Sequence, residues 1–167
     1  SQDGTIKVWH IETGECMATF DDGDFAMNGL AVLSPSRIAG ASDDCVVKIW
    51  DVDAGRCVAT LEGHLGPVVS IVGLDDGQLA SGSFDHSIKV WDVDSRRCLK
   101  TLKGHSDGVL CLATLSSSRC ASGSIDATVK IWDLQAGRCT ATLEGHKDPV
   151  FSIVAFDHDR LASCSGA

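Results

Sequence analysis

Short runs of apolar residues alternate with polar turns along the whole chain. In one unit, Leu79–Ser83, Ser87–Trp91, Cys98–Leu102 and Val109–Leu115 form four such runs, separated by Gly, Asp, Ser and basic residues. Short runs with these separators are typical of strands at hairpin spacing. No stretch has a convincing helical period. The pattern therefore predicts an all-β chain of short antiparallel strands.

The pattern repeats with a period of 41 residues. The tryptophans recur at this interval, as do an Asp six residues before each of them and a Gly-His pair. The members of these columns are Trp9, Trp50, Trp91 and Trp132; Asp3, Asp44, Asp85 and Asp126; and Gly63-His64, Gly104-His105 and Gly145-His146. Four strands in each unit of this length predict the blades of a β-propeller.

At these residues the chain resembles the WD-repeat family. The motifs are Gly-His, Leu-Ala-Ser-Gly-Ser-x-Asp and Lys-Val/Ile-Trp-Asp at fixed offsets, and the resemblance covers the whole chain. It implies that Gly-His lies between the outermost strand of one blade and the innermost strand of the next. We expect a half-blade at 1–20, blades at 21–61, 62–102 and 103–143, and a half-blade at 144–167.

The resemblance also implies a buried hydrogen-bonded network of Trp, Ser, His and Asp in each blade. The expected sets are His64, Ser81, Asp85 and Trp91; His105, Ser122, Asp126 and Trp132; and, from the two ends of the chain, His146 and Ser163 with Asp3 and Trp9. Ser, His and Asp together also suggest a hydrolytic triad. Their recurrence in several copies favours a structural role instead, because a fully satisfied buried network fixes one arrangement.

The blade of Trp50 departs from the pattern. Gly23 stands in the His column and Gly40 in the Ser column, so that only Asp44 and Trp50 remain of the network. We expect this blade to be the loosest.

Three arrangements of the blades remain open. One is an arc of a longer propeller, since family members usually have seven or eight blades and four would need about 90° per blade. A second is a homodimer that completes an eight-blade ring from shared half-blades. A third is a closed four-blade ring.

Charge and cysteine spacing exclude several functions. A formal net charge of −9 over 167 residues disfavours nucleic acid as a partner, and no apolar stretch is long enough to predict a membrane span. Cysteines one unit apart are too distant for disulfides, and no Cys-x-x-Cys pair indicates a metal or redox site. We expect no metal and no cofactor. The cysteines are interpreted as small buried hydrophobes in a reducing, intracellular compartment, cytoplasmic or nuclear.

A partner is expected on the face that carries the Gly-His loops and the Asp turns, where the four repeats differ from one another. The candidate residues are Phe84, Ile125, Leu65, Asp24, Phe25, Asp43, Asp107 and Lys147. An exposed aromatic beside an apolar neighbour predicts a binding hot spot at Phe84 and Ile125. The alternative is that both side chains pack on an adjoining loop.

We expect a protein-interaction scaffold or adaptor without catalytic activity. Acidic residues dominate the predicted binding face and most arginines lie in turns opposite, so a basic or apolar peptide is favoured over a phosphorylated one. Repeats such as Gly-Arg-Cys-Val-Ala-Thr-Leu are similar to those of F-box substrate receptors. A substrate-recognition propeller of a ubiquitin ligase is therefore the alternative function.

Overall fold

The computed structural model describes residues 4–21, 23 and 25–166, and all of its regular elements are strands. Their bounds are β1 Thr5–Trp9, β2 Cys16–Asp21, β3 Met27–Ser34, β4 Arg37–Ser42, β5 Val47–Asp51, β6 Arg56–Leu61, β7 Val68–Gly73, β8 Gln78–Ser83, β9 Ser87–Asp92, β10 Arg97–Lys103, β11 Val109–Ser116, β12 Arg119–Ser124, β13 Val129–Asp133, β14 Arg138–Leu143, β15 Val150–Ala155 and β16 Leu161–Ser165. Two of the predicted site residues, Asp3 and Asp24, lie outside the described residues.

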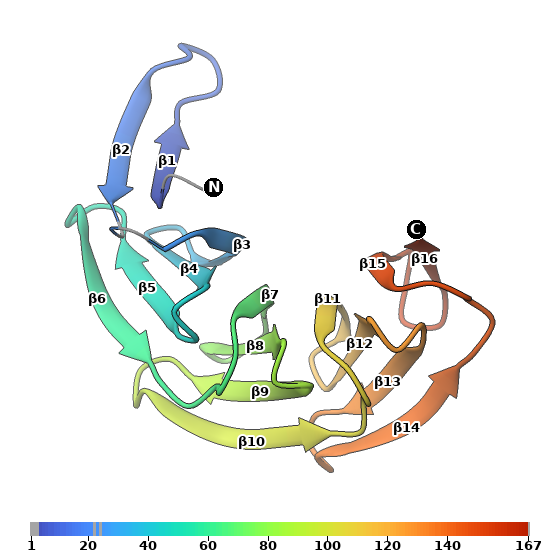
Figure 1. Cartoon of the computed structure of the whole chain (residues 1–167). Helices are drawn as coiled ribbons and strands as arrows, with labels where there is room; N and C mark the ends of the chain where they lie inside the picture. Colours follow the sequence, from blue (N-terminus) through green and yellow to red (C-terminus); the bar gives the residue numbers. More distant parts are fainter. Residues whose placement is uncertain (1–3, 22, 24, 167) are drawn as a thin grey trace.

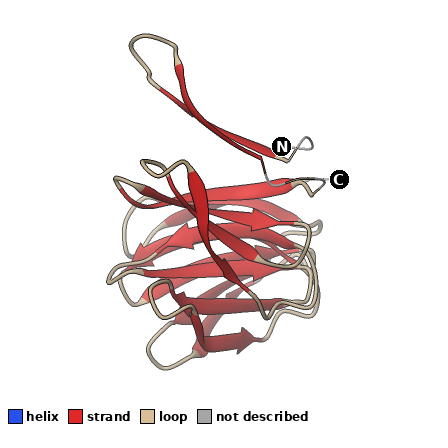
Figure 2. Cartoon of the chain, turned by 90° about the vertical axis from the view of Figure 1, so that its left-hand side faces the viewer, coloured by secondary structure: helices blue, strands red, loops and turns tan. Residues whose placement is uncertain are grey.

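The strands form five antiparallel sheets arranged as an open arc (Figure 1). Three sheets have four strands each: β3–β6, β7–β10 and β11–β14, here named blades B, C and D. At the ends of the arc, β1–β2 and β15–β16 form two-stranded sheets. Figure 2 shows the first of these hairpins projecting from the rest of the chain. The predicted fold class, a partial β-propeller of four-stranded blades, is confirmed.

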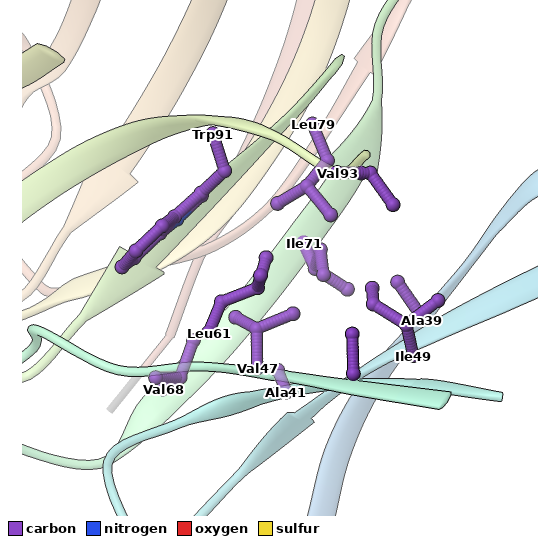
Figure 3. Close-up of a cluster of buried hydrophobic side chains, with 11 residues drawn as sticks. Ala39, Ala41, Val47, Ile49, Leu61, Val68, Ile71, Leu79, Trp91 and Val93 are labelled. Carbon is purple, nitrogen blue, oxygen red and sulfur yellow. The ribbon is translucent and has the colours of Figure 1, made fainter. Parts of the chain in front are cut away.

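Successive blades stack through their innermost strands. The first strand of each blade contacts the first strand of the next, in the order β3, β7, β11 and β15. Between blades B and C, the side chains of Ile49 and Leu61 from one blade meet Ile71, Leu79 and Trp91 from the other (Figure 3). The apolar core is therefore a series of layers between blades, as burial on both faces of each sheet requires.

The regular 41-residue spacing of the tryptophans places each of them at the same point of its sheet. Trp50, Trp91 and Trp132 are 2% exposed or less. The strand register shifts immediately before Trp50, where β5 pairs with β6, and immediately before Trp132, where β13 pairs with β14. The glycine of Gly-His leaves room for the indole, because a Cβ at Gly63, where φ is 147°, would lie 3.3 Å from Trp91 Cη2.

The interpretation of the cysteines as buried hydrophobes is wrong for half of them. Cys111 and Cys120 are buried, but Cys16, Cys57 and Cys98 are exposed. The repeated cysteine lies on the outermost strand of its blade, where no further strand covers it. Cys164, on β16, is also exposed, and all eight thiols are free. In the part of the chain that the structure describes, no helix is long and apolar enough to cross a membrane.

Candidate functional site

In blade C, four polar side chains form a continuous hydrogen-bonded chain. His64 Nδ1 lies 2.7 Å from Asp85 Oδ2, and His64 Nε2 lies 2.8 Å from Ser81 Oγ. The indole nitrogen of Trp91 donates to the same Ser81 oxygen at 2.8 Å. The first serine of Ser-Gly-Ser thus joins the network. The second, Ser83, donates instead to the Gly66 carbonyl and holds the loop.

Electrostatics fix the protonation state of this network. Burial lowers the pKa of His64, and its effect exceeds the opposing effect of the Asp85 carboxylate. Burial alone would raise the pKa of Asp85, but hydrogen bonds from Ser87, the Leu65 N–H and His64 outweigh it and lower the pKa. With Asp85 ionised and His64 neutral, Nδ1–H donates to the carboxylate and Nε2 accepts from the Ser81 hydroxyl. Every donor then has an acceptor.

Blade D repeats this geometry. His105 Nδ1 lies 2.8 Å from Asp126 Oδ2, His105 Nε2 lies 2.7 Å from Ser122 Oγ, and Trp132 donates to Ser122 at 2.7 Å. Burial lowers the pKa of His105. Burial alone would raise the pKa of Asp126. Hydrogen bonds with Thr128 and His105 outweigh this effect and lower the pKa to about 2.

Each network contains one more hydroxyl group than the sequence motifs predicted. Ser87 and Thr128 donate to the second carboxylate oxygen of Asp85 and Asp126, at 2.6 and 2.7 Å. The signal was the hydroxyl residue that stands four residues before Trp in three of the four units. Val46 occupies this column in blade B and obscures it.

The connection from Ser to His to Asp matches that of a hydrolytic triad, but its surroundings do not. Ser81 and Ser122 are fully buried, and His64 and His105 are 6% and 7% exposed. Each serine oxygen already accepts an indole N–H. A nucleophile needs access to a substrate carbonyl, and these hydroxyls have none in this structure.

Blade B replaces the polar network by apolar packing. The Trp50 ring lies against Gly40, where a Cβ would come within 2.7 Å of Trp50 Cζ3 and 3.1 Å of Met27 Sδ. Phe20 also packs against Trp50, with the two ring centroids 6.3 Å apart. Asp44 forms an ion pair of 3.2 Å with Lys48 through Oδ2. Its other oxygen, Oδ1, is buried and has no hydrogen-bond partner among the described residues.

The two ends of the chain each hold half of the fourth predicted network. His146 Nε2 lies 2.8 Å from Ser163 Oγ, as in the complete blades. Trp9 is 56% exposed and belongs to the separate β1–β2 sheet at the other end of the arc. Within one chain, the structure does not bring these residues together.

The loops between blades form a common face, here called the loop face. It comprises the Gly-His loops Gly63–Pro67 and Gly104–Gly108 and the turns Phe84–His86 and Ile125–Ala127. Phe84 is 43% exposed, and Ile125 is half-buried. Both side chains lie against Gly108, because a Cβ there would be 2.7 Å from Phe84 Cδ1 and 3.2 Å from Ile125 Cδ1. Phe84 and Ile125 therefore form one apolar patch across the junction of blades C and D.

Charged groups border this patch, called the Phe84–Ile125 patch below. His86 Nε2 lies 3.8 Å from Asp107 Oδ1, and this ion pair joins the turn of blade C to the loop of blade D.

The other residues predicted to bind a partner are also at the surface. Leu65 is 92% exposed, and Phe25 and Lys147 are also exposed. Asp43 accepts a hydrogen bond from Asn28 Nδ2 at 2.7 Å, and the same amide donates to the Val68 carbonyl. Asp43 is exposed, and through its hydrogen bond with Asn28 it also helps to hold blades B and C together.

No metal site is formed by the described residues, since no group of three or more His, Cys, Asp or Glu side chains is placed to hold an ion.

Comparison with protein-family models gives a match to the model described as "WD domain, G-beta repeat". It matches four times, at residues 14–51, 55–92, 96–133 and 137–166. A search of curated protein sequences returned no match.

Proposed function

The chain belongs to the WD-repeat family, and we propose that it is a scaffold or adaptor that captures a protein or peptide on its loop face. WD repeats generally mediate protein–protein interactions. The observation that carries the proposal is the Phe84–Ile125 patch, an exposed apolar surface that spans two blades and lies outside the buried networks. Patches of this kind, bordered by polar residues, mark interaction sites.

Charge on the loop face supports a basic or apolar partner. Asp43, Asp107 and Asp148 border the loops, together with Glu62 and Glu144 directly before two Gly-His pairs. On the opposite face, Arg37 pairs with Asp94 at 2.9 Å, and Arg96 and Arg119 donate to backbone carbonyls. A phosphopeptide site would need free arginines next to the patch. The negative charge of the chain likewise argues against nucleic acid.

The buried networks support a non-catalytic function, because their hydroxyl and imidazole groups are satisfied and inaccessible. The exposed free thiols of Cys16, Cys57 and Cys98 are consistent with a reducing, intracellular compartment. A second copy that closes a ring would leave the loop face open for the same partner.

A peptide array tests the proposed partner class. Basic apolar, acidic and phosphorylated peptides are compared for binding to the wild-type chain, to the variant with both Phe84→Ala and Ile125→Ala, and to a Leu99→Ala control. Leu99 is 46% exposed on β10, away from the loops. We expect binding of basic apolar peptides to be lost in the double variant and kept in the control. Preferential capture of phosphopeptides would favour the ubiquitin-ligase alternative, and equal binding by the wild type and the double variant would refute the patch.

A further inference from the structure

A groove lies between each pair of neighbouring complete blades, at the end of the strands opposite the loop face. One wall is formed by the turn between the first and second strands of a blade and by its third and fourth strands, and the other wall by two turns of the next blade. The grooves between blades B and C and between blades C and D, called the B–C and C–D grooves below, are built from equivalent positions 41 residues apart. Differences between their side chains therefore show what each groove can hold.

The B–C groove is occupied by an arginine of the chain itself. Arg37 Nη1 lies 2.9 Å from Asp94 Oδ1, and this ion pair crosses from blade B to blade C. Both residues line two separate hollows in the groove, of about 310 and 90 Å³. The Arg37 side chain thus divides the B–C groove in two and shows that a guanidinium fits there.

The C–D groove lacks this arginine. Gln78 stands at the position of Arg37. Gln135 stands at the position of Asp94, so two neutral amides replace the ion pair. The groove is one hollow of about 270 Å³, lined mostly by positions equivalent to those around both hollows of the B–C groove.

The C–D groove has two carboxylates where the B–C groove has uncharged residues. Asp75 and Asp76 line the C–D groove and correspond in sequence to Ser34 and Pro35. Both carboxylates belong to exposed residues, and neither has an ion-pair partner among the described residues. The groove that lacks an arginine of its own thus carries two carboxylates that can bind one.

The rest of the lining can hold the methylene groups of an arginine. Val90 and Leu134 are 2% and 6% exposed, Leu99 is 46% exposed, and all three line the C–D groove. Lys100 also lines it, but its ammonium donates to the carbonyl oxygens of Leu134 and Gln135 and is thereby held against blade D. The groove therefore combines an apolar floor with acceptors for a cation, and an arginine side chain has both an apolar stem and a charged head.

We propose that the C–D groove binds an arginine side chain of a partner protein. Its guanidinium donates to the carboxylates of Asp75 and Asp76, and its methylene stem covers the apolar floor. A planar guanidinium pairs with a carboxylate through two N–H groups, which a lysine ammonium cannot do. No arginine among the described residues lines this groove. Arg119, the next arginine of the column, donates to the His158 carbonyl at 3.4 Å and so belongs to the junction that follows blade D.

This site is separate from the Phe84–Ile125 patch, because the two lie at opposite ends of the strands. The inference therefore does not depend on the proposed capture of a partner by the loop face. The formal net charge of −9 favours the approach of basic segments to the chain.

NMR titration of the isotope-labelled chain with the peptide acetyl-Ala-Ala-Arg-Ala-Ala-amide tests the proposal. The peptide has no large apolar side chain, so it does not measure capture by the apolar patch. We expect the amide signals of Gly77, Ser118 and Gln135 to shift, with a dissociation constant of about 1–10 mM, because a single side chain in a surface groove binds weakly. The same peptide with citrulline, which has a similar shape but no charge, should bind roughly tenfold more weakly or less.

Two variants of the groove test where the arginine binds. Asp75→Asn together with Asp76→Asn removes both charges and should raise the dissociation constant by roughly tenfold or more. Asparagine tolerates the φ of 58° at Asp76, so the turn is kept. Gln78→Arg together with Gln135→Asp recreates the ion pair of the B–C groove and should abolish binding, because the new arginine of the chain occupies the groove.

The variant with both Phe84→Ala and Ile125→Ala is the matched control and should bind the peptide as the wild type does. Equal binding of the arginine and citrulline peptides would overturn the proposal, as would unshifted groove signals in the wild type at the highest soluble peptide concentration. Unchanged binding by the chain with Gln78→Arg and Gln135→Asp would also overturn it. Loss of binding in the control would place the arginine on the loop face and refute the groove as its site.

Discussion

The indole N–H of Trp91 donates to the hydroxyl oxygen of Ser81 at 2.8 Å, and neither side chain is more than 1% exposed. Ser81 also lies 2.8 Å from His64 Nε2, so a single oxygen connects the indole to the imidazole and the Asp85 carboxylate. Removal of either partner leaves a buried polar group without a partner.

Ser81→Ala and Trp91→Phe should each lower the free energy of unfolding by about 1–3 kcal/mol. The double variant should lose less than the sum of the two, because both changes break the same chain of hydrogen bonds. Urea titrations of the four proteins give the coupling. Strictly additive losses would show that the hydroxyl and the indole act independently.

Two substitutions in blade B, each to the residue type found in blades C or D, should change the free energy of unfolding in opposite directions. Gly40→Ser should destabilise the chain by about 1–3 kcal/mol, because its Cβ would lie 2.7 Å from the Trp50 ring. Val46→Thr should stabilise it by about 0.5–1.5 kcal/mol, because the new hydroxyl can donate to the buried Asp44 Oδ1. Urea denaturation of both variants measures the difference, and a gain in stability from Gly40→Ser would contradict the apolar packing around Trp50.

The repeat columns predicted the four-stranded blades and four members of each network in blades C and D, but not the hydroxyl groups of Ser87 and Thr128. Trp91, His64, Ser81 and Asp85 recur at one period, and equivalent positions must have equivalent surroundings. The 41-residue period could not show which side chain fills the space where a network residue is absent, as at Gly40 in blade B. Met27 fills the space at Gly40 from a column that has no polar role.

Exposure was harder to predict than pairing. A cysteine in every unit resembles a core position, yet its strand is the outermost one, and a strand's place in the sheet is not visible in a local pattern. The contact of Phe84 and Ile125 at Gly108 depends on how loops of neighbouring blades meet, and this is a long-range property.

The stability of the chain should fall in two steps as the pH is lowered. The folded pKa values of His64 and His105 lie below their ordinary value of 6.5, so the unfolded chain binds protons first and stability declines as the pH falls below about 6.5. The pKa values of Asp85 and Asp126 are also lowered from 3.8, and their contribution is lost as the pH falls further, below about 4.

Urea titrations at pH 7.5, 6.5 and 5.5 measure the first step. A variant with His64→Gln and His105→Gln should be less stable than the wild type at pH 7.5 but should lose less stability between pH 7.5 and 5.5. An equal loss in both proteins would assign the pH dependence to other groups.

The thiols should divide into two classes of reactivity. Cys16, Cys57 and Cys98 are exposed on the outermost strands and should be alkylated by iodoacetamide in the native protein. Cys120 is fully buried, and burial raises the pKa of its thiol to about 12. Burial likewise raises the pKa of Cys111 to about 11. Because the thiolate is the reactive form, both should be alkylated only when their blade opens, so mass spectrometry at neutral pH should find them modified in urea and unmodified without it. Rapid native labelling of Cys120 would show that the layer between blades C and D is not packed as the structure places it, since Ala80, Leu102 and Trp132 close that layer around the thiol.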